Sequence, residues 1–271
     1  NWTAREGRPD AAAAASILAG SFPNPTVQAA IDTNKTVQRI KAHRVTLKIH
    51  SIPEKDVRHF VVADASFDPT GKSKPQHGWL QGITSPRLNQ GLDAPISLLA
   101  WKSRRLRRKA GNTMLCESIS LSTALGALER QIAMWNSFRL SRYDPRLQAE
   151  LDDSQGRRGA PVVVASDDPD FADPLSIAII DAKSLFDASA SEQSSGDCDR
   201  SALEIAIIQD SIARCRGRVR WLPHNLNPAD SLTKLAGAHE KPMMDFLQTS
   251  QLRIQAEEIT LAQGRQHEVR K

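Results

Sequence analysis

The chain has 271 residues, of which 40% are hydrophobic and 25% charged, the composition of an ordinary soluble globular protein. This composition excludes collagen-like, coiled-coil and wholly disordered chains. The net charge of +5 is unevenly distributed, because residues 1–110 hold 18 basic and 8 acidic side chains whereas residues 111–271 hold 18 and 23. A polyanionic partner is expected to meet the first part of the chain.

The three cysteines are far apart and form no CxxC pair, so the sequence predicts neither a disulfide framework nor a structural zinc site. No apolar run approaches the ~20 residues that a membrane span needs, and no secretory leader precedes the first elements. We therefore expect an intracellular protein, cytoplasmic or nuclear, that is not secreted and has no membrane partner. Because the chain opens on Asn1, we interpret it as a fragment of a longer protein.

The first 55 residues are expected to lie outside the main domain. Residues 1–22 are rich in alanine and are followed by prolines, which predicts a poorly ordered segment. Apolar residues at helical spacing predict a helix from Thr26 to about Ala42, and an extended stretch from Val45 to Ile52 predicts a strand.

The main domain is expected over residues 56–250. Short apolar runs at 59–64, 77–83 and 96–101, separated by turn residues, predict an antiparallel meander of three strands. Residues 113–138 predict a long amphipathic helix that lies on this sheet, with one apolar face formed by Leu121, Leu125, Leu128, Ile132 and Trp135.

The second half of the domain alternates loops with further helices and strands. Residues 141–175 are polar and rich in proline, which predicts a long loop or insertion. A buried strand over 175–181, a helix from 182, a helix over 202–214, a strand over 218–222 and a last helix from about 228 follow. Residues 251–271 are expected to form a C-terminal tail.

Four acidic residues stand where the apolar pattern predicts burial. Asp64 and Asp181 each end an apolar strand, where an α/β sheet presents side chains to a crevice. Glu117 falls on the apolar face of the long helix, and Asp230 lies near the start of the last helix. Each also has a purely structural interpretation: an Asx turn for Asp64, a helix N-cap for Asp181, and favourable helix-dipole positions for Glu117 and Asp230.

Together, the four carboxylates could converge on one crevice and bind Mg²⁺, which prefers oxygen ligands. Two such ions activate water and stabilise the leaving oxygen in the hydrolysis of a phosphodiester. A basic run leads into the helix of Glu117, and it is either a phosphate-binding surface or a solvated or localisation segment. Its cationic residues are Lys102, Arg104, Arg105, Arg107, Arg108 and Lys109.

Five motifs, in this order, resemble the ribonuclease H domain of copia-type LTR-retrotransposon polyproteins. They are ADASF at 63–67, WKS at 101–103, CE at 116–117 before a helix, IDAKSL at 180–185 and PADSLTK at 228–234. The resemblance covers roughly residues 56–250, and residues 23–55 resemble the tail of the preceding reverse transcriptase. One departure is that residues 113–118 read TMLCES where family members commonly have STEAEY.

The resemblance implies an α/β, RNase H-like fold with a five-stranded mixed sheet flanked by helices. It implies that Asp64, Glu117, Asp181 and Asp230 form a catalytic site for two Mg²⁺ ions, with Mn²⁺ as an alternative, and that His224 assists product release. The expected partners are an RNA/DNA hybrid and the reverse transcriptase portion of the same polyprotein. The sequence leaves open a second hypothesis, a catalytically inactive or host-recruited module that binds nucleic acid without cutting it.

Overall fold

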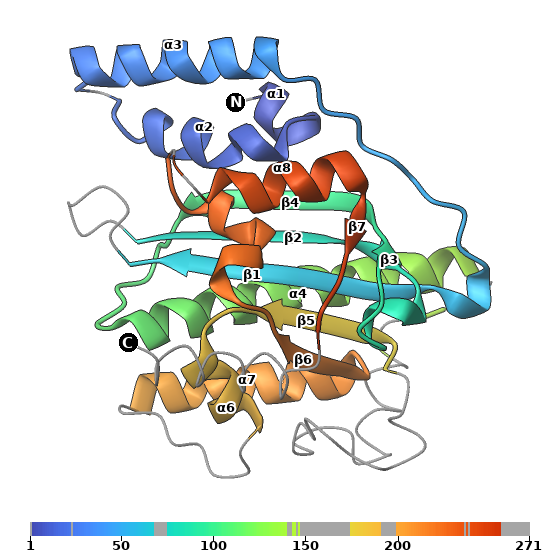
Figure 1. Ribbon diagram of the computed structural model, residues 1–271. Helices are drawn as coiled ribbons and strands as arrows, with labels where there is room; N and C mark the ends of the chain where they lie inside the picture. The colour runs from blue at the N-terminus through green and yellow to red at the C-terminus, as the bar shows by residue number, and fades with distance from the viewer. Residues whose placement is uncertain are drawn as a thin grey trace, which may run out of the picture.

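The computed structural model describes residues 2–22, 24–67, 75–139, 143–144, 146, 174–190, 199–235, 237 and 239–255. Its centre is a five-stranded sheet in the order β4-β2-β1-β5-β6 (Figure 1). Strand β2 pairs antiparallel with both β1 and β4, whereas β5 runs parallel to both β1 and β6. The expected α/β fold class, with a five-stranded mixed sheet, is therefore confirmed. The strands are β1 (Arg58–Ser66), β2 (Gln76–Thr84), β4 (Ser97–Arg105), β5 (Ser176–Ile180) and β6 (Gly217–Trp221).

Both faces of β1 are buried, because successive apolar side chains point to opposite faces of the strand. Val61 and Ala63 point to the face covered by α4 (Thr113–Arg139), α6 (Lys183–Ala190) and α7 (Asp199–Arg214). Phe60 and Val62 point to the opposite face, which α8 (Glu240–Thr249) and a 3-10 turn at Pro228–Leu232 cover. The predicted helix over 113–138 is confirmed as α4. It begins where the side chain of Asn112 accepts a 2.7 Å hydrogen bond from the backbone N–H of Leu115.

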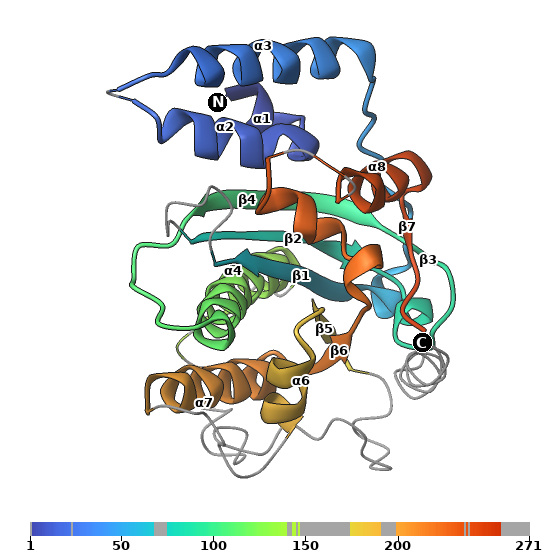
Figure 2. The same cartoon turned by 60° about the vertical axis from the view of Figure 1, so that its left-hand side comes forward.

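The N-terminal segment is ordered, so the expectation for residues 1–22 is wrong. It forms α1 (Trp2–Glu6), a 3-10 turn at Pro9–Ala11 and α2 (Ala12–Ala19), and the predicted helix that follows is confirmed as α3 (Val27–Ala42). Small side chains let α2 approach β4 closely, and Ala11 to Ala14 are buried there. Figure 2 shows α2 lying between α3 and β4. Alanine-rich composition alone did not reveal that β4 offers this segment a packing surface.

The stretch from Val45 to Ile52 is extended but is not assigned to a strand, so the expected strand is wrong. Val45 and Leu47 pack on the α8 side of the core, and the backbone N–H of His50 donates to Ser97 Oγ at 2.8 Å. Contacts with side chains thus hold this stretch in place, instead of backbone hydrogen bonds to a neighbouring strand. Further 3-10 turns lie at Glu54–Asp56, Pro86–Leu88 and His224–Leu226.

The C-terminal part of the domain also differs from expectation. The last helix was expected from about residue 228, but Pro228–Leu232 is a 3-10 turn and α8 begins only at Glu240. Residues 251–271 were expected to form a tail, but β7 (Gln251–Leu252) pairs antiparallel with β3 (Ala94–Pro95), and Ile254 is fully buried. Most of the predicted loop at 141–175 lies outside the described residues, as do residues 256–271.

Candidate metal centre

Asp64 and Asp181 lie side by side at the same edge of the sheet. The parallel register pairs Val62 of β1 with Ile179 of β5, and continuing it by two residues places Asp64 opposite Asp181. The carboxyl ends of parallel strands meet at one edge, so two acidic residues at equivalent strand ends become neighbours. The sequence argument from strand-end carboxylates therefore located this pair.

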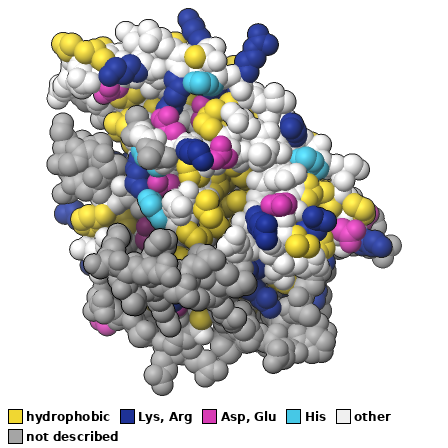
Figure 3. Space-filling view, in the orientation of Figure 1, with side chains coloured by type: hydrophobic (Ala, Val, Ile, Leu, Met, Phe, Trp, Pro, Cys, Tyr) yellow, Lys and Arg dark blue, Asp and Glu magenta, His cyan; other side chains and the backbone are white. Residues whose placement is uncertain are grey.

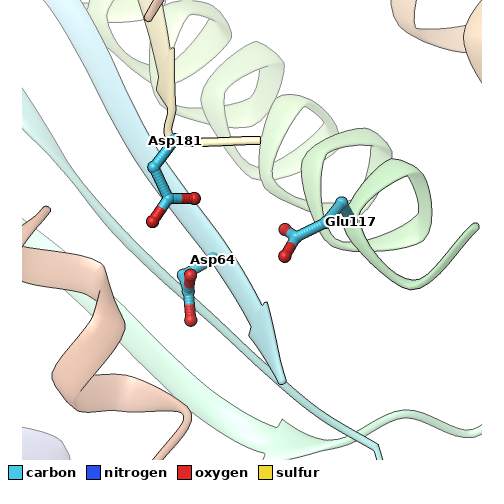
Figure 4. Close-up of side chains that lie close together, drawn as sticks. All are labelled: Asp64, Glu117 and Asp181. Atoms are coloured by element: carbon cyan, nitrogen blue, oxygen red, sulfur yellow. The ribbon is translucent and has the colours of Figure 1, made fainter. Parts of the chain in front are cut away.

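Glu117 reaches the same edge from α4, as Figure 4 shows. It is the fifth residue of that helix and lies beyond the first turn, so the interpretation of Glu117 as a helix-dipole position is wrong. The backbone N–H of Ala65 donates to its carboxylate. One carboxylate oxygen from each of Asp64, Glu117 and Asp181 lies within 4.8 Å of the other two.

The three carboxylates lie close enough to repel one another, and burial strengthens this repulsion. Burial, then the charges of Asp181 and Asp230, raise the pKa of Asp64 from 3.8 to about 7. Burial, then the charges of Asp64 and Asp181, raise the pKa of Glu117 well above its ordinary range. A cation bound among these oxygens would offset the repulsion between the carboxylates that contributes to both shifts. The donor set, oxygen only, is the one that Mg²⁺ or Mn²⁺ prefers.

Two hydroxyl groups hold Asp64 in place, and the sequence analysis identified neither. Thr233 Oγ1 donates to Asp64 Oδ2, and Ser120 Oγ of α4 donates to the Asp64 backbone carbonyl at 2.8 Å. The position of Ser120, three residues after Glu117 and therefore on the same side of α4, was the available signal.

Asp230 lies beside the three carboxylates but is not part of the group whose oxygens come together within 4.8 Å. It is 1% exposed in the turn Pro228–Leu232, and its charge acts on Asp64. Lys234 Nζ forms an ion pair with Asp230 Oδ1, a partner that the sequence analysis missed although it stands four residues further along the chain.

His224 connects Asp181 with Asp230. Its Nδ1 lies 2.9 Å from Asp181 Oδ2 and its Nε2 lies 3.5 Å from Asp230 Oδ2. The imidazole is 63% exposed, whereas both carboxylates are at least nine-tenths buried. His224 is therefore the solvent-side member of the cluster, next to two of the predicted ligands.

A cavity of about 740 Å³ opens beside His224, Asp230 and Lys234. Phe246 and Leu252 form part of its apolar wall. On the face drawn in Figure 3, charged side chains of both signs and histidines surround an apolar surface. Asp230 and His224 thus border a hollow large enough for part of a polymeric ligand, and Asp64, Glu117 and Asp181 are not among the residues that line it.

The predicted basic segment is largely exposed, but two of its side chains have protein partners. Arg104 Nε donates to His77 Nε2 at 3.0 Å. Arg108 Nη1 lies 2.5 Å from Glu204 Oε1, a buried carboxylate of α7 that also accepts from Ser122. Exposed cationic side chains remain at Lys102, Arg105, Arg107 and Lys109.

Comparisons with known proteins add little to this geometry. No protein-family model matches the sequence, and no curated protein matches it. Among solved structures, the chain is similar to the N-terminal RNase H domain of rv2228c from Mycobacterium tuberculosis, which was solved as a fusion with maltose-binding protein. The identity is 12%, the TM-score is 0.36, and the match covers 72% of this chain and 99% of that chain. No helix among the described residues has both the length and the apolar character to cross a bilayer.

Proposed function

We propose that the protein is a Mg²⁺-dependent ribonuclease that hydrolyses the RNA strand of RNA/DNA hybrids. The observation that carries the proposal is the group of three carboxylates, buried Asp64 and half-buried Glu117 and Asp181, gathered at one edge of an RNase H-like sheet. The sequence resemblance to copia-type retrotransposon RNase H domains supplies the substrate and the setting, reverse transcription. In that setting residues 23–55 belong to the end of the reverse transcriptase region.

The three carboxylates would hold the metal, with Asp230 as the fourth ligand that the resemblance implies. The raised pKa values of Asp64 and Glu117 are those expected of metal ligands when no cation balances their charge. When bound, two Mg²⁺ ions supply an activated water and stabilise the leaving oxygen of the phosphodiester.

Neighbouring side chains orient these carboxylates, and a histidine lies on the solvent side of the site. Thr233 fixes one oxygen of Asp64, and Lys234 holds Asp230 at the edge of the cavity. His224, exposed and in contact with two carboxylates, is positioned to exchange protons with solvent and to assist product release.

The exposed cations of the basic segment would bind the phosphates of the hybrid. Contacts to phosphates and 2′-hydroxyls read the shape of the duplex and not its sequence, as an enzyme that clears any transcript requires. Binding should therefore weaken steeply with salt.

The test is cleavage of a labelled RNA/DNA hybrid with Mg²⁺ and with chelator. We expect metal-dependent cutting of the RNA strand by the wild-type chain, and no product from Asp181→Asn, which should still bind the hybrid. Glu6→Gln, an exposed carboxylate outside the site, is the control and should cut normally. Hybrid binding without any metal-dependent product from the wild-type chain would instead support the catalytically inactive or host-recruited binding module.

A further inference from the structure

A second cavity, of about 720 Å³, lies at the opposite end of β1 from the carboxylates. Its walls come from the start of β1, the end of α4 and the end of α7, including His59, Trp135 and Arg216. Figure 1 shows the start of β1 and the end of α4 on the same side of the molecule, away from the arrowhead of β1. Asp64 follows His59 by five residue steps along the strand, about 16 Å. The two cavities share no lining residue and are distinct.

One wall of this cavity is aromatic and apolar. Trp135 is partly exposed there, and Ile132, Ala133 and Val57 contribute further apolar surface. The rings of Trp135 and His59 meet edge to face, with centroids 6.0 Å apart. An aromatic ring of a ligand could stack or pack edge to face on this wall.

The other wall is cationic. Two of its acidic residues are already neutralised, Glu54 by Arg139 at 2.5 Å and Glu129 by Arg214 at 2.6 Å. Within the described part of the chain, Lys55 and Arg216 form no ion pair. The cavity therefore has an excess of positive charge, which favours an anion.

The backbone of Arg216 is unusual for its residue type. Its φ of +48° is a left-handed conformation that glycine adopts more readily. The carbonyl of Arg216 accepts a 3.0 Å hydrogen bond from Leu175 N–H, which fixes this conformation just after α7. Strained residues of this kind concentrate where a side chain serves a ligand.

His59 adds an unused hydrogen-bond donor. It is 5% exposed, and its Nδ1 lies 2.9 Å from Gln131 Nε2. That amide nitrogen is a donor that also binds the Gly82 carbonyl, so His59 accepts at Nδ1 and carries its proton at Nε2. No hydrogen bond to Nε2 is found among the described residues.

We propose that this cavity binds a nucleoside phosphate, with the base against Trp135 and Ile132 and the phosphate on Arg216 and Lys55. His59 would donate from Nε2 to an oxygen of the ligand. The nucleoside phosphate belongs either to a free nucleotide or to the phosphorylated end of a single-stranded nucleic acid. The proposal does not depend on the nuclease activity, because it concerns a different cavity.

The test uses calorimetry with AMP, adenosine and inorganic phosphate, in the Asp64→Asn background and without metal. AMP should bind more tightly than either half of the molecule. Arg216→Gly should weaken the binding of AMP and phosphate about tenfold but leave adenosine unchanged, because it removes a charged donor. Trp135→Leu should weaken AMP and adenosine but not phosphate.

Replacing Arg216 by glycine allows a loss of ligand binding to be distinguished from a loss of folding stability. Since residue 216 has a left-handed backbone, Arg216→Gly should preserve or raise the melting temperature while binding falls. Arg44→Gly, an exposed position outside the cavity, removes the same charge and should leave binding unchanged. A 5′-phosphorylated oligonucleotide that binds more tightly than AMP identifies a strand end as the source, and equal affinity identifies a free nucleotide. Phosphate binding as tight as AMP binding, or AMP affinity unchanged by both cavity variants, would overturn the proposal.

Discussion

Asp64 is held in an environment that opposes its charge. Burial and two acidic neighbours raise its pKa to about 7, although Thr233 donates to it and Lys234 lies nearby. The folded protein therefore binds a proton at Asp64 that the unfolded chain releases near pH 4. Without metal, the free energy of unfolding consequently falls as the pH rises from about 4 to about 7.

Replacing Asp64 by asparagine should stabilise the metal-free protein and eliminate cleavage. The amide keeps the shape but removes the like-charge repulsion, so at pH 8 the melting temperature should rise by about 2–4 °C for each kcal/mol gained. Thermal unfolding in chelator measures this. Asp187→Asn, at an exposed residue of α6, is the control and should change the melting temperature little. A lower melting temperature for Asp64→Asn would contradict the repulsion inferred here.

The acidic residues of the site could be predicted from the sequence more readily than the groups that hydrogen-bond to them. Asp64 and Asp181 could be found because apolar strands end at them, and Glu117 because it shares a face with buried leucines. Thr233 could not be found as a partner of Asp64, because a hydroxyl in the chain carries no signal of what it will meet after folding. Ser120 had one signal, its position on the same side of α4 as Glu117.

The turn Pro228–Leu232 depends on a glycine in β2. Gly78 pairs with Asp64, and a Cβ atom added to it would lie 2.3 Å from the Cβ of Leu232 and 3.2 Å from the Lys102 carbonyl. Any side chain at residue 78 would push the turn, and Asp230 with it, away from the sheet.

Gly78→Ala should therefore lower both stability and hybrid cleavage. Overpacking of this kind costs about 1–3 kcal/mol, which chemical denaturation can measure. Gly126→Ala is the matched control, because nothing lies within 4 Å of a Cβ atom at that position in α4. The control should stabilise the protein by about 0.5–1 kcal/mol. Equal effects of the two substitutions would show that the turn does not rest on Gly78.

Helix α2 behaves as part of the core, and a pair of substitutions can test this. Ala13 is 1% exposed, so Ala13→Asp buries a charge and should lower the melting temperature strongly, through a loss of several kcal/mol. Ala19→Asp places the same charge at the exposed end of the helix and should have little effect. If residues 1–22 formed a detached tail, both variants would melt like the wild type.

Helices and strands with a strong apolar periodicity could be predicted from the sequence. Elements that form only through contacts between distant parts of the chain could not. The alternation in β1 and the long apolar face of α4 both identify their elements within a short window of sequence. The β3–β7 pairing joins two-residue strands more than 150 residues apart, so it exists only once the domain has folded. The stretch from Val45 to Ile52 has the composition of a strand, but it is held by side-chain contacts with the core and with Ser97.

At the scale of the whole molecule, metal binding should couple to pH. Mg²⁺ competes with protons for Asp64 and Glu117, because both carboxyl groups have raised pKa values. Saturating Mg²⁺ should therefore raise the melting temperature more at pH 8 than at pH 5.5, as measured by thermal unfolding with and without chelator. Glu117→Gln should reduce the increase at pH 8. A melting temperature that does not respond to Mg²⁺ at either pH would contradict a metal centre at these residues.

The position of α2 has a consequence for shortened forms of the protein. β4 is the first strand in the sheet order and is nine residues long, so one side of it has no strand neighbour. α2 lies along that side, where Gln76 Nε2 donates to Ser16 Oγ and Trp101 Nε1 to the Ala4 carbonyl. A chain that began at residue 56 would keep all five strands but present a bare edge, and such edges add strands from other molecules. We therefore expect the shortened chain to self-associate where the full chain does not.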